Sequence, residues 1–243
     1  MRRLFLISLL VGLLTNVQAQ NEPPETVLKK IPDYRFNVSY AWRPSQPIQH
    51  LEIGLNKDLL NLKQDQIRLG LGVRAGIQDN NGVPFTTAHA DLKKSDGNID
   101  TLSLDRVQSF AFNFYANAEY YLMEKLSVGM NLDLLGFTAG QEFDGTFLPG
   151  SASRQAGHTS DNTVTAFPTS SNAYSSQNSK GSLNAQLFVR FEPFRRVGLR
   201  GGFSYLFQEF STENGYGANE AYRFENNGLG FFIGVTFNRI EEK

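Results

Sequence analysis

The stretch Gln66–Gln78, QIRLGLGVRAGIQ, alternates strictly between two kinds of residue. The positions Arg68 and Arg74, with the glycines between and after them, form one set. The apolar side chains at every second position form the other: Ile67, Leu69, Leu71, Val73, Ala75 and Ile77. A helix would scatter both sets around its circumference, whereas a strand separates them. The stretch is therefore predicted to be a β-strand with one apolar and one polar face.

The same period-two pattern recurs along the chain. Seven further strands are predicted, over residues 34–42, 49–59, 107–122, 126–137, 182–192, 197–210 and 229–238. These strands are longer than the ~5–6 residues usual in soluble sheets. They fit the ~9–11 residues that a tilted transmembrane strand needs.

The connections between these strands alternate in length. Short links lie at 61–65, 123–125 and 193–196, and long ones at about 79–106, 141–181 and 211–228. Only the hairpin at 43–48 is short on the long-loop side. Short periplasmic turns and long extracellular loops are typical of outer-membrane barrels. The predicted fold class is all-β: an eight-stranded antiparallel up-and-down transmembrane β-barrel over residues 34–243.

A soluble, lipocalin-like barrel is the alternative fold. It would hide the apolar faces inside and turn the opposite faces, rich in Gly, Asn and Ser, to water. Soluble surfaces are normally rich in Lys and Glu, so the membrane barrel is the better interpretation.

Composition narrows the function classes. The 243 residues contain no Cys, which excludes a disulfide scaffold and any thiolate metal site. The net charge is −1 and no basic block occurs, so a nucleic-acid partner is not expected. The mean hydropathy of −0.32 reflects the absence of the runs of ~20 apolar residues that helical spans need.

The first residues read as a targeting segment. Met1-Arg2-Arg3 precedes the apolar run 4–14 and a small-residue site at Ala19, which is the pattern of a cleaved signal peptide at 1–19. Residues 20–33 contain three prolines and are predicted to be a short periplasmic lead-in. The predicted location is the outer membrane of a Gram-negative bacterium.

The leader, the strand ladder and the final stretch GFFIGVTFN (230–238) together resemble a known family. They are similar to the small outer-membrane β-barrel proteins of Bacteroidota and their OmpA- and OmpX-like relatives, as is the Ala19-Gln20 junction. The resemblance covers nearly the whole mature chain, but it is one of pattern and includes no motif specific for an activity. It implies outer-membrane lipid as surroundings and insertion by the barrel-assembly machinery. One departure is that Phe237 is followed by NRIEEK, whereas such barrels often end on an aromatic residue.

Charged residues on the polar faces are predicted to meet inside the barrel. Isolated charges are costly to bury, so they are expected to pair and plug the narrow lumen. The predicted lumen charge network is His50, Glu52, Arg68, Arg74, Glu119, Asp133, Arg190, Glu192 and Arg200. A narrow small-solute channel lined by these charges is an alternative.

The sequence contains only weak indications of a catalytic or a metal-binding site. A lipid A acylase or deacylase would need a His beside a Ser or Asp, and the chain has only His50, His89 and His158, the last in His158–Asp161 (HTSD). Asp96, Asn98 and Asp100 resemble an acidic turn, but Asx-rich turns are common. No enzyme activity, metal or cofactor is expected, and the lipid A-modifying enzyme is the runner-up function.

Aromatic residues gather toward strand ends, as in the girdles of membrane barrels. The predicted girdle is Tyr34, Tyr40, Trp42, Tyr120, Tyr121, Phe191, Phe194, Tyr205 and Phe207. Lys57, Lys125, Arg195 and Arg196 lie beside the short turns, where they would meet anionic head groups.

The polar loop 141–181 is expected to lack structure of its own. Alternatively it extends the strands as a hairpin through Phe143, Phe147 and Leu148. The leading function is a structural or surface-interaction role, with an unknown extracellular or envelope partner bound through the long loops.

Overall fold

The computed structural model describes residues 34–44, 48–63, 66–88, 99–175, 179–194 and 196–239. All of them belong to Pro32–Lys243, one of two compact units of the chain. The predicted signal peptide, lead-in and C-terminal tail from Ile240 lie outside the described residues, as do His89, Asp96, Asn98 and Arg195. None of the helices in the described part is long and apolar enough to span a membrane.

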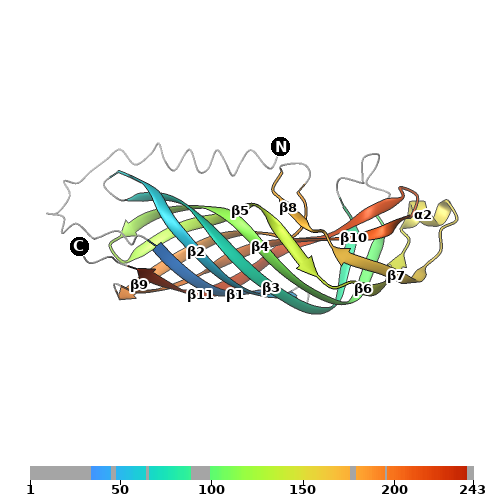
Figure 1. The fold of residues 1–243 in the computed structure, drawn as a ribbon, viewed down its shortest axis with the longest axis horizontal. Coiled ribbons are helices and arrows are strands. Elements are labelled where there is room, and N and C mark those ends of the chain that lie inside the picture. The colour runs from blue at the N-terminus through green and yellow to red at the C-terminus, as the bar shows by residue number, and fades with distance from the viewer. Residues whose placement is uncertain are drawn as a thin grey trace. The chain divides into compact units, whose positions relative to one another are not determined.

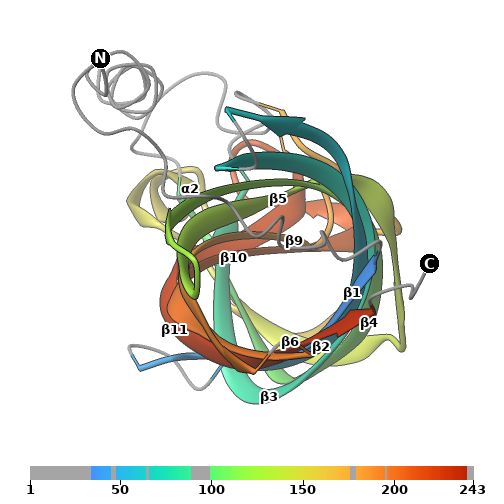
Figure 2. The same ribbon diagram turned by 90° about the vertical axis from the view of Figure 1, so that its left-hand side faces the viewer.

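One closed ring of antiparallel strands dominates the fold (Figures 1 and 2). Each strand pairs with the next, and the last pairs with the first. We call it the main ring; its members are β1 (Tyr34–Arg43), β2 (Ile48–Leu62), β3 (Ile67–Thr87), β4 (Thr101–Met123), β5 (Leu126–Gly140), β9 (Leu183–Phe194), β10 (Val197–Tyr216) and β11 (Ala221–Arg239). The end that holds the short β4–β5 turn is called the turn end.

Three shorter strands bring the sheet to 11 strands, against the eight predicted, and one helix accompanies them. They are β6 (Phe143–Leu148), α2 (Ser151–Gln155), β7 (Asp161–Pro168) and β8 (Ser171–Ala173). All four lie in the segment predicted as one long loop, 141–181, so that prediction is wrong. The alternative hairpin is what the structure shows, because β6 pairs with both β4 and β7.

The other two long loops are also mostly strand. β3 runs to Thr87 and β4 starts at Thr101, so 15 of the 28 residues of the predicted loop 79–106 lie in strands. β10 and β11 likewise extend through most of 211–228, to a turn at 217–220. The extensions form because they bury apolar side chains, among them Phe85 and Phe210, at 0% exposure.

These extensions close a second, smaller ring beyond the β1–β2 hairpin. Its order is β3, β4, β6, β7, β10 and β11, and β11 returns to β3 through the pair Phe224–Thr87. β1 and β2 take no part, because their ladder ends at the Arg43–Ile48 pair. We call this second ring the cap ring; it is at the right of Figure 1.

The two rings have opposite polarity. In the main ring, apolar side chains such as Leu71 (52% exposed) face outward and polar ones such as Asn37 (4%) face inward. In the cap ring Val83 and Leu104 are buried, whereas Thr86 is exposed. On β3 the reversal follows Gly82, whose φ of +62° is in the region that favours glycine. Gly82 on β3 and Asp105 on β4 are the one pair missing from this ladder, whose register is the same on either side, and the side chains of both strands change face there.

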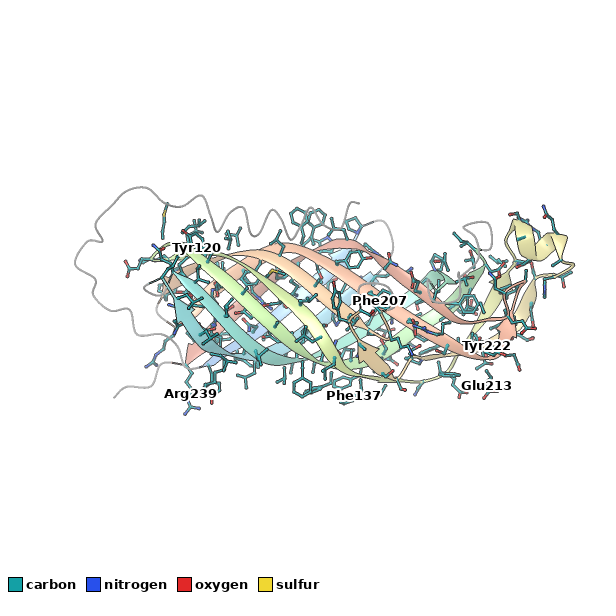
Figure 3. All side chains as sticks on the ribbon, turned by 90° about the horizontal axis from the view of Figure 1, so that it is seen from above. Tyr120, Phe137, Phe207, Glu213, Tyr222 and Arg239 are labelled. Atoms are coloured by element: carbon teal, nitrogen blue, oxygen red, sulfur yellow. The ribbon has the colours of Figure 1, made fainter. Side chains whose placement is uncertain are left out.

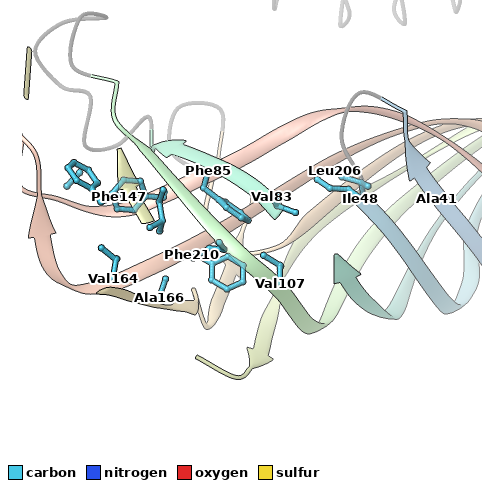
Figure 4. Close-up of a cluster of buried hydrophobic side chains, with 14 of the residues drawn as sticks. Ala41, Ile48, Val83, Phe85, Val107, Phe147, Val164, Ala166, Leu206 and Phe210 are labelled. Carbon is cyan, nitrogen blue, oxygen red and sulfur yellow. The ribbon is translucent and has the colours of Figure 1, made fainter. Parts of the chain in front are cut away.

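The inside of the cap ring is a core of packed apolar side chains. Phe85 and Phe210 stack edge to face with ring centroids 5.1 Å apart, and Phe147 packs against Phe224 and Tyr216 (Figure 4). The buried cluster continues into the near end of the main ring through Ala41, Ile48, Leu206 and Phe232. The main ring is therefore closed at one end by packed apolar side chains.

Candidate functional site

The interior of the main ring holds two clusters of paired charges. The turn-end cluster is centred on Glu119. Its carboxylate receives Arg35 on one oxygen and lies 2.6 Å from Arg190 Nη2 on the other. Arg35 also pairs with Asp58, which Arg68 approaches at 3.9 Å.

A tyrosine hydroxyl joins the arginines of this cluster. Arg68 Nη1 donates to the Tyr121 hydroxyl at 3.0 Å and Arg190 Nη2 donates to it at 2.5 Å. The Arg68 guanidinium also lies 4.2 Å from the centre of the Tyr121 ring. Tyr121 thus holds two cations in place and does not belong to the outer girdle.

The central cluster lies further along the barrel and is built on Arg74. Its Nε and Nη2 lie 2.6 and 2.5 Å from Asp133 Oδ1, and its Nη1 lies 3.5 Å from Glu52. Arg200 approaches Glu52 at 3.6 Å. Neutral donors complete the Glu52 shell: Ser39 at 2.7 Å, Gln186 at 2.6 Å and Asn184 at 2.9 Å.

These charges balance. Five arginines face five carboxylates, and no side chain among them is more than 5% exposed: Arg35, Arg68, Arg74, Arg190 and Arg200 against Glu52, Asp58, Glu119, Asp133 and Glu192. Removing one member would leave an opposite charge buried without its partner. The interior is therefore a mutually dependent network.

The structure places all nine residues of the predicted lumen network inside the main ring. Glu52, Arg74, Asp133 and Arg200 meet in the central cluster, with His50 3.9 Å from Glu52. Arg68, Glu119, Arg190 and Glu192 meet at the turn end. The prediction omitted Arg35 and Asp58, although strand alternation puts both on the same faces as the other charges.

One small cavity lies at the end of the polar interior that is nearest the cap ring. It has a volume of about 20 Å³ and is lined by His50, Arg74, Asp133, Ser182 and neighbouring residues. Such a volume holds about one water molecule. His50, a serine and an acid thus line the same cavity, but Asp133 is bound by Arg74 and the cavity is too small for an acyl chain.

The predicted aromatic girdle divides into outward and inward members. Tyr34, Tyr40, Phe191, Phe194 and Tyr205 are exposed on the outer face. Trp42, Tyr120 and Phe207 are half-buried on that face. Figure 3 shows Tyr120 near the turn end and Phe207 further along. Tyr121 is 8% exposed and points inward, so its assignment to the girdle is wrong: it follows Tyr120 directly, and adjacent strand residues face opposite sides.

The other candidate residues do not assemble into a site. His158 is exposed, and Asp161 accepts hydrogen bonds from the amide and hydroxyl of Thr163 rather than from its HTSD neighbours. These hydrogen bonds lower the pKa of Asp161. Asp100 is fully buried and accepts from Gly150 N at 2.7 Å and Ser153 Oγ at 2.9 Å. Among the described residues, no group of His, Asp and Glu is arranged to hold a metal ion.

Comparisons with known proteins give only remote likenesses. No protein-family model matches the chain, and no curated protein matches its sequence. Among solved structures, the Yersinia pestis outer membrane protein Ail in a phospholipid bilayer nanodisc aligns at 10% identity and a TM-score of 0.37, over 85% of this chain and 98% of Ail.

Two further solved structures show similar values. Neisserial surface protein A aligns at 11% identity and a TM-score of 0.36, covering 84% and 94% of the two chains. The Ralstonia pickettii toluene transporter TbuX aligns at 9% identity and 0.26, covering 80% and 68%. Likenesses this remote carry no argument about this chain.

Proposed function

We propose that the chain is an integral outer-membrane barrel with a structural or surface-interaction role and no catalysis. The eight strands of the main ring span the bilayer, and the cap ring stands on the extracellular side. A cleaved signal peptide and the barrel-assembly machinery would deliver it there.

The observation that supports this proposal most strongly is the reversal of polarity between the two rings. An apolar exterior requires lipid, and an apolar interior with a polar exterior requires water. On β3 the outward apolar residues run from Ile67 to Ile77. At ~3.3 Å per residue and a tilt of ~40° they span roughly 25 Å along the barrel axis, the height of the apolar band of outer-membrane barrels.

The interior supports a plugged lumen. The turn-end cluster and the central cluster occupy the main ring, and the apolar core occupies the cap ring. A narrow channel would need a continuous path through both. The small cavity at His50, Ser182 and Asp133 is the one feature that favours a lipid A-modifying enzyme, and its size argues against that role.

Cysteine labelling tests location and orientation together, because the chain has no Cys of its own. Thr165→Cys places a thiol on the exposed face of the cap ring, and Lys125→Cys places one at the turn end. We expect a membrane-impermeant maleimide to label the first variant on intact cells and the second only after permeabilisation. The reverse order, or a soluble monomer without detergent, would contradict the proposal.

The enzymatic alternative has its own test. Mass spectrometry of lipid A is compared between cells with and without the gene, and we expect identical acyl chains. A difference that Ser182→Ala or His50→Gln abolishes would establish the enzyme instead.

A further inference from the structure

Three buried polar atoms around the small cavity of the main ring have no hydrogen-bond partner. Among the described residues, Arg74 Nη1, His50 Nδ1 and Ser182 Oγ are buried and form no hydrogen bond, and all three residues line the cavity. They come from β3, from β2 and from the position just before β9. A buried polar atom without a hydrogen bond is costly, and native structures contain few of them. Three such atoms around one space indicate a site for a small polar ligand.

The main acceptor beside the cavity is already occupied. Asp133 Oδ1 accepts from Arg74 Nε at 2.6 Å, and Oδ2 accepts from Asn113 Nδ2 and from the Asn184 amide, each at 2.8 Å. Asn113 Oδ1 accepts from Asn172 at 2.7 Å. Of the three unpartnered atoms, the guanidinium nitrogen can only donate, whereas the hydroxyl oxygen and the imidazole nitrogen can donate or accept.

A glycine fixes the orientation of the imidazole. A Cβ at Gly76 would collide with His50 Nε2, so this edge of the ring lies against the β3 backbone. The Nδ1 atom lies 3.9 Å from Glu52 Oε2, and Arg74 Nη1 lies 3.5 Å from the same oxygen. Two of the three unpartnered nitrogen and oxygen atoms therefore lie on the same side of the cavity, beside one carboxylate.

The protonation state of His50 decides which ligand suits these atoms. With a neutral imidazole, one water molecule accepts from Arg74 and donates to His50 Nδ1 and Ser182 Oγ. On a protonated imidazole both nitrogens are donors. A water molecule then has only the Ser182 hydroxyl as an acceptor for its two hydrogens, whereas an anion accepts from all three groups.

The charge balance points to the same ligand. The charged groups that face His50 are Glu52 on its own strand, Arg74 on β3 and Asp133 on β5, and the other residues that line the cavity carry no charge. Arg74 and Arg200 already balance Glu52 and Asp133. A proton on His50 thus leaves one buried positive charge in excess, and a single monovalent anion restores neutrality.

We propose that the cavity binds one halide ion together with a proton on His50. The donors to the ion are Arg74 Nη1, His50 Nδ1 and Ser182 Oγ. A volume of about 20 Å³ holds a ligand of the size of one water molecule, which chloride matches and which carboxylates, phosphate and sulfate exceed. The proton and the ion strengthen each other's binding by the same factor. This binding is independent of the surface role proposed above.

Bromide tests the site directly, because it scatters X-rays anomalously. Crystals of the full-length barrel are soaked in bromide at about pH 5 and at about pH 8, on either side of the usual titration of histidine. We expect one anomalous peak between Arg74, His50 and Ser182 at the lower pH and none at the higher. His50→Gln should lose the peak, and His158→Gln, at an exposed position, is the matched control that keeps it.

Urea unfolding in lipid vesicles gives a second readout, in potassium chloride and in potassium gluconate, whose anion is too large for the cavity. A ligand that binds only the folded state raises the unfolding midpoint. At about pH 5 we expect a higher midpoint in chloride for the wild type and for His158→Gln. The two salts should give the same midpoint for His50→Gln, and the difference should shrink for Ser182→Ala, which removes one donor without adding bulk. General salt effects act on all four proteins alike.

Two results would overturn the coupling to a proton: a bromide peak of equal height at both pH values, or one that His50→Gln retains. Two others would overturn anion binding itself. The first is ordered water without an anomalous signal at the lower pH, and the second is equal wild-type midpoints in chloride and gluconate.

Discussion

Arg74 on β3 and Asp133 on β5 lie 59 positions apart in the sequence, yet Arg74 Nη2 is 2.5 Å from Asp133 Oδ1 inside the main ring. β4 separates the two strands, so the ion pair reaches across a neighbouring strand through the lumen. Asn113 on β4 donates to the other Asp133 oxygen at 2.8 Å. The side chains thus tie three strands together from the inside.

Removing both partners of this pair should cost less than the two single removals added together. Arg74→Met or Asp133→Leu alone leaves a buried charge, and we expect each to lower the free energy of unfolding by about 3–5 kcal/mol. The double variant should lose less than the sum of the two. Urea unfolding in lipid measures this cycle. The exposed Arg106–Asp79 pair is the control, for which Asp79→Asn should change little; additive losses at Arg74 and Asp133 would show that the pair does not interact.

Adjacent tyrosines on β4 should respond differently to loss of the hydroxyl. Tyr121 accepts from Arg68 and Arg190 inside the ring, whereas Tyr120 faces outward. Tyr121→Phe is expected to lower stability by about 1–3 kcal/mol, because hydrogen bonds to charged groups are lost in a buried place. Tyr120→Phe should be nearly neutral. Equal effects on the unfolding midpoint would place both side chains in the same surroundings.

A single charge should locate the membrane boundary on β3. Leu71 is 52% exposed in the middle of the proposed lipid-facing band, and Thr86 is exposed in the cap ring. Leu71→Arg is predicted to destabilise the folded barrel in bilayers by about 2–4 kcal/mol. Thr86→Arg should have no measurable effect. Folding equilibria in lipid vesicles distinguish these outcomes, and a larger loss at Thr86 would place the bilayer around the wrong ring.

Loss of a buried side chain in the cap ring should destabilise the cap ring and leave the main ring unchanged. Phe85→Ala removes a fully buried ring that packs against Phe210, which should cost about 3–5 kcal/mol locally. We expect faster hydrogen exchange at 83–87 and 101–104 and unchanged exchange at 67–77. The neighbouring Thr86→Ala, on the outer face, should leave both regions unchanged. A uniform increase after Phe85→Ala would mean that the two rings unfold as one unit.

The main ring could be predicted from sequence because its signal is local. Alternation along β3 assigns each side chain to lipid or lumen without knowledge of any partner strand. Arg35 and Asp58 were missed although the same rule identifies them: Arg35 alternates with Tyr34 and Phe36, and Asp58 lies two positions after Asn56. Tyr121 lies near a strand end, where girdle aromatics are expected, but its position on β4 is on the inward face.

The cap ring could not be predicted in the same way, because its polarity is the reverse of the pattern being followed. Val83 and Phe85 alternate as a strand does, but after Gly82 they have changed face. The segment 141–181 is polar in composition because its strands place threonines on the solvent-exposed face and bury only a few apolar residues, such as Phe147 and Val164. Which strands β6 and β7 join depends on pairing with β4 and β10, far away in the sequence.

Single-channel conductance of the refolded barrel in planar bilayers tests the central claim most directly. With insertion shown by impermeant labelling of Thr165→Cys on one side only, the packed charges and the apolar cap core should leave the membrane without stable open steps. Removing the Arg74–Asp133 pair by the double variant Arg74→Met, Asp133→Leu should leave it closed, because the turn-end cluster and the cap core remain. A stable ohmic conductance in the wild type would contradict the plugged barrel.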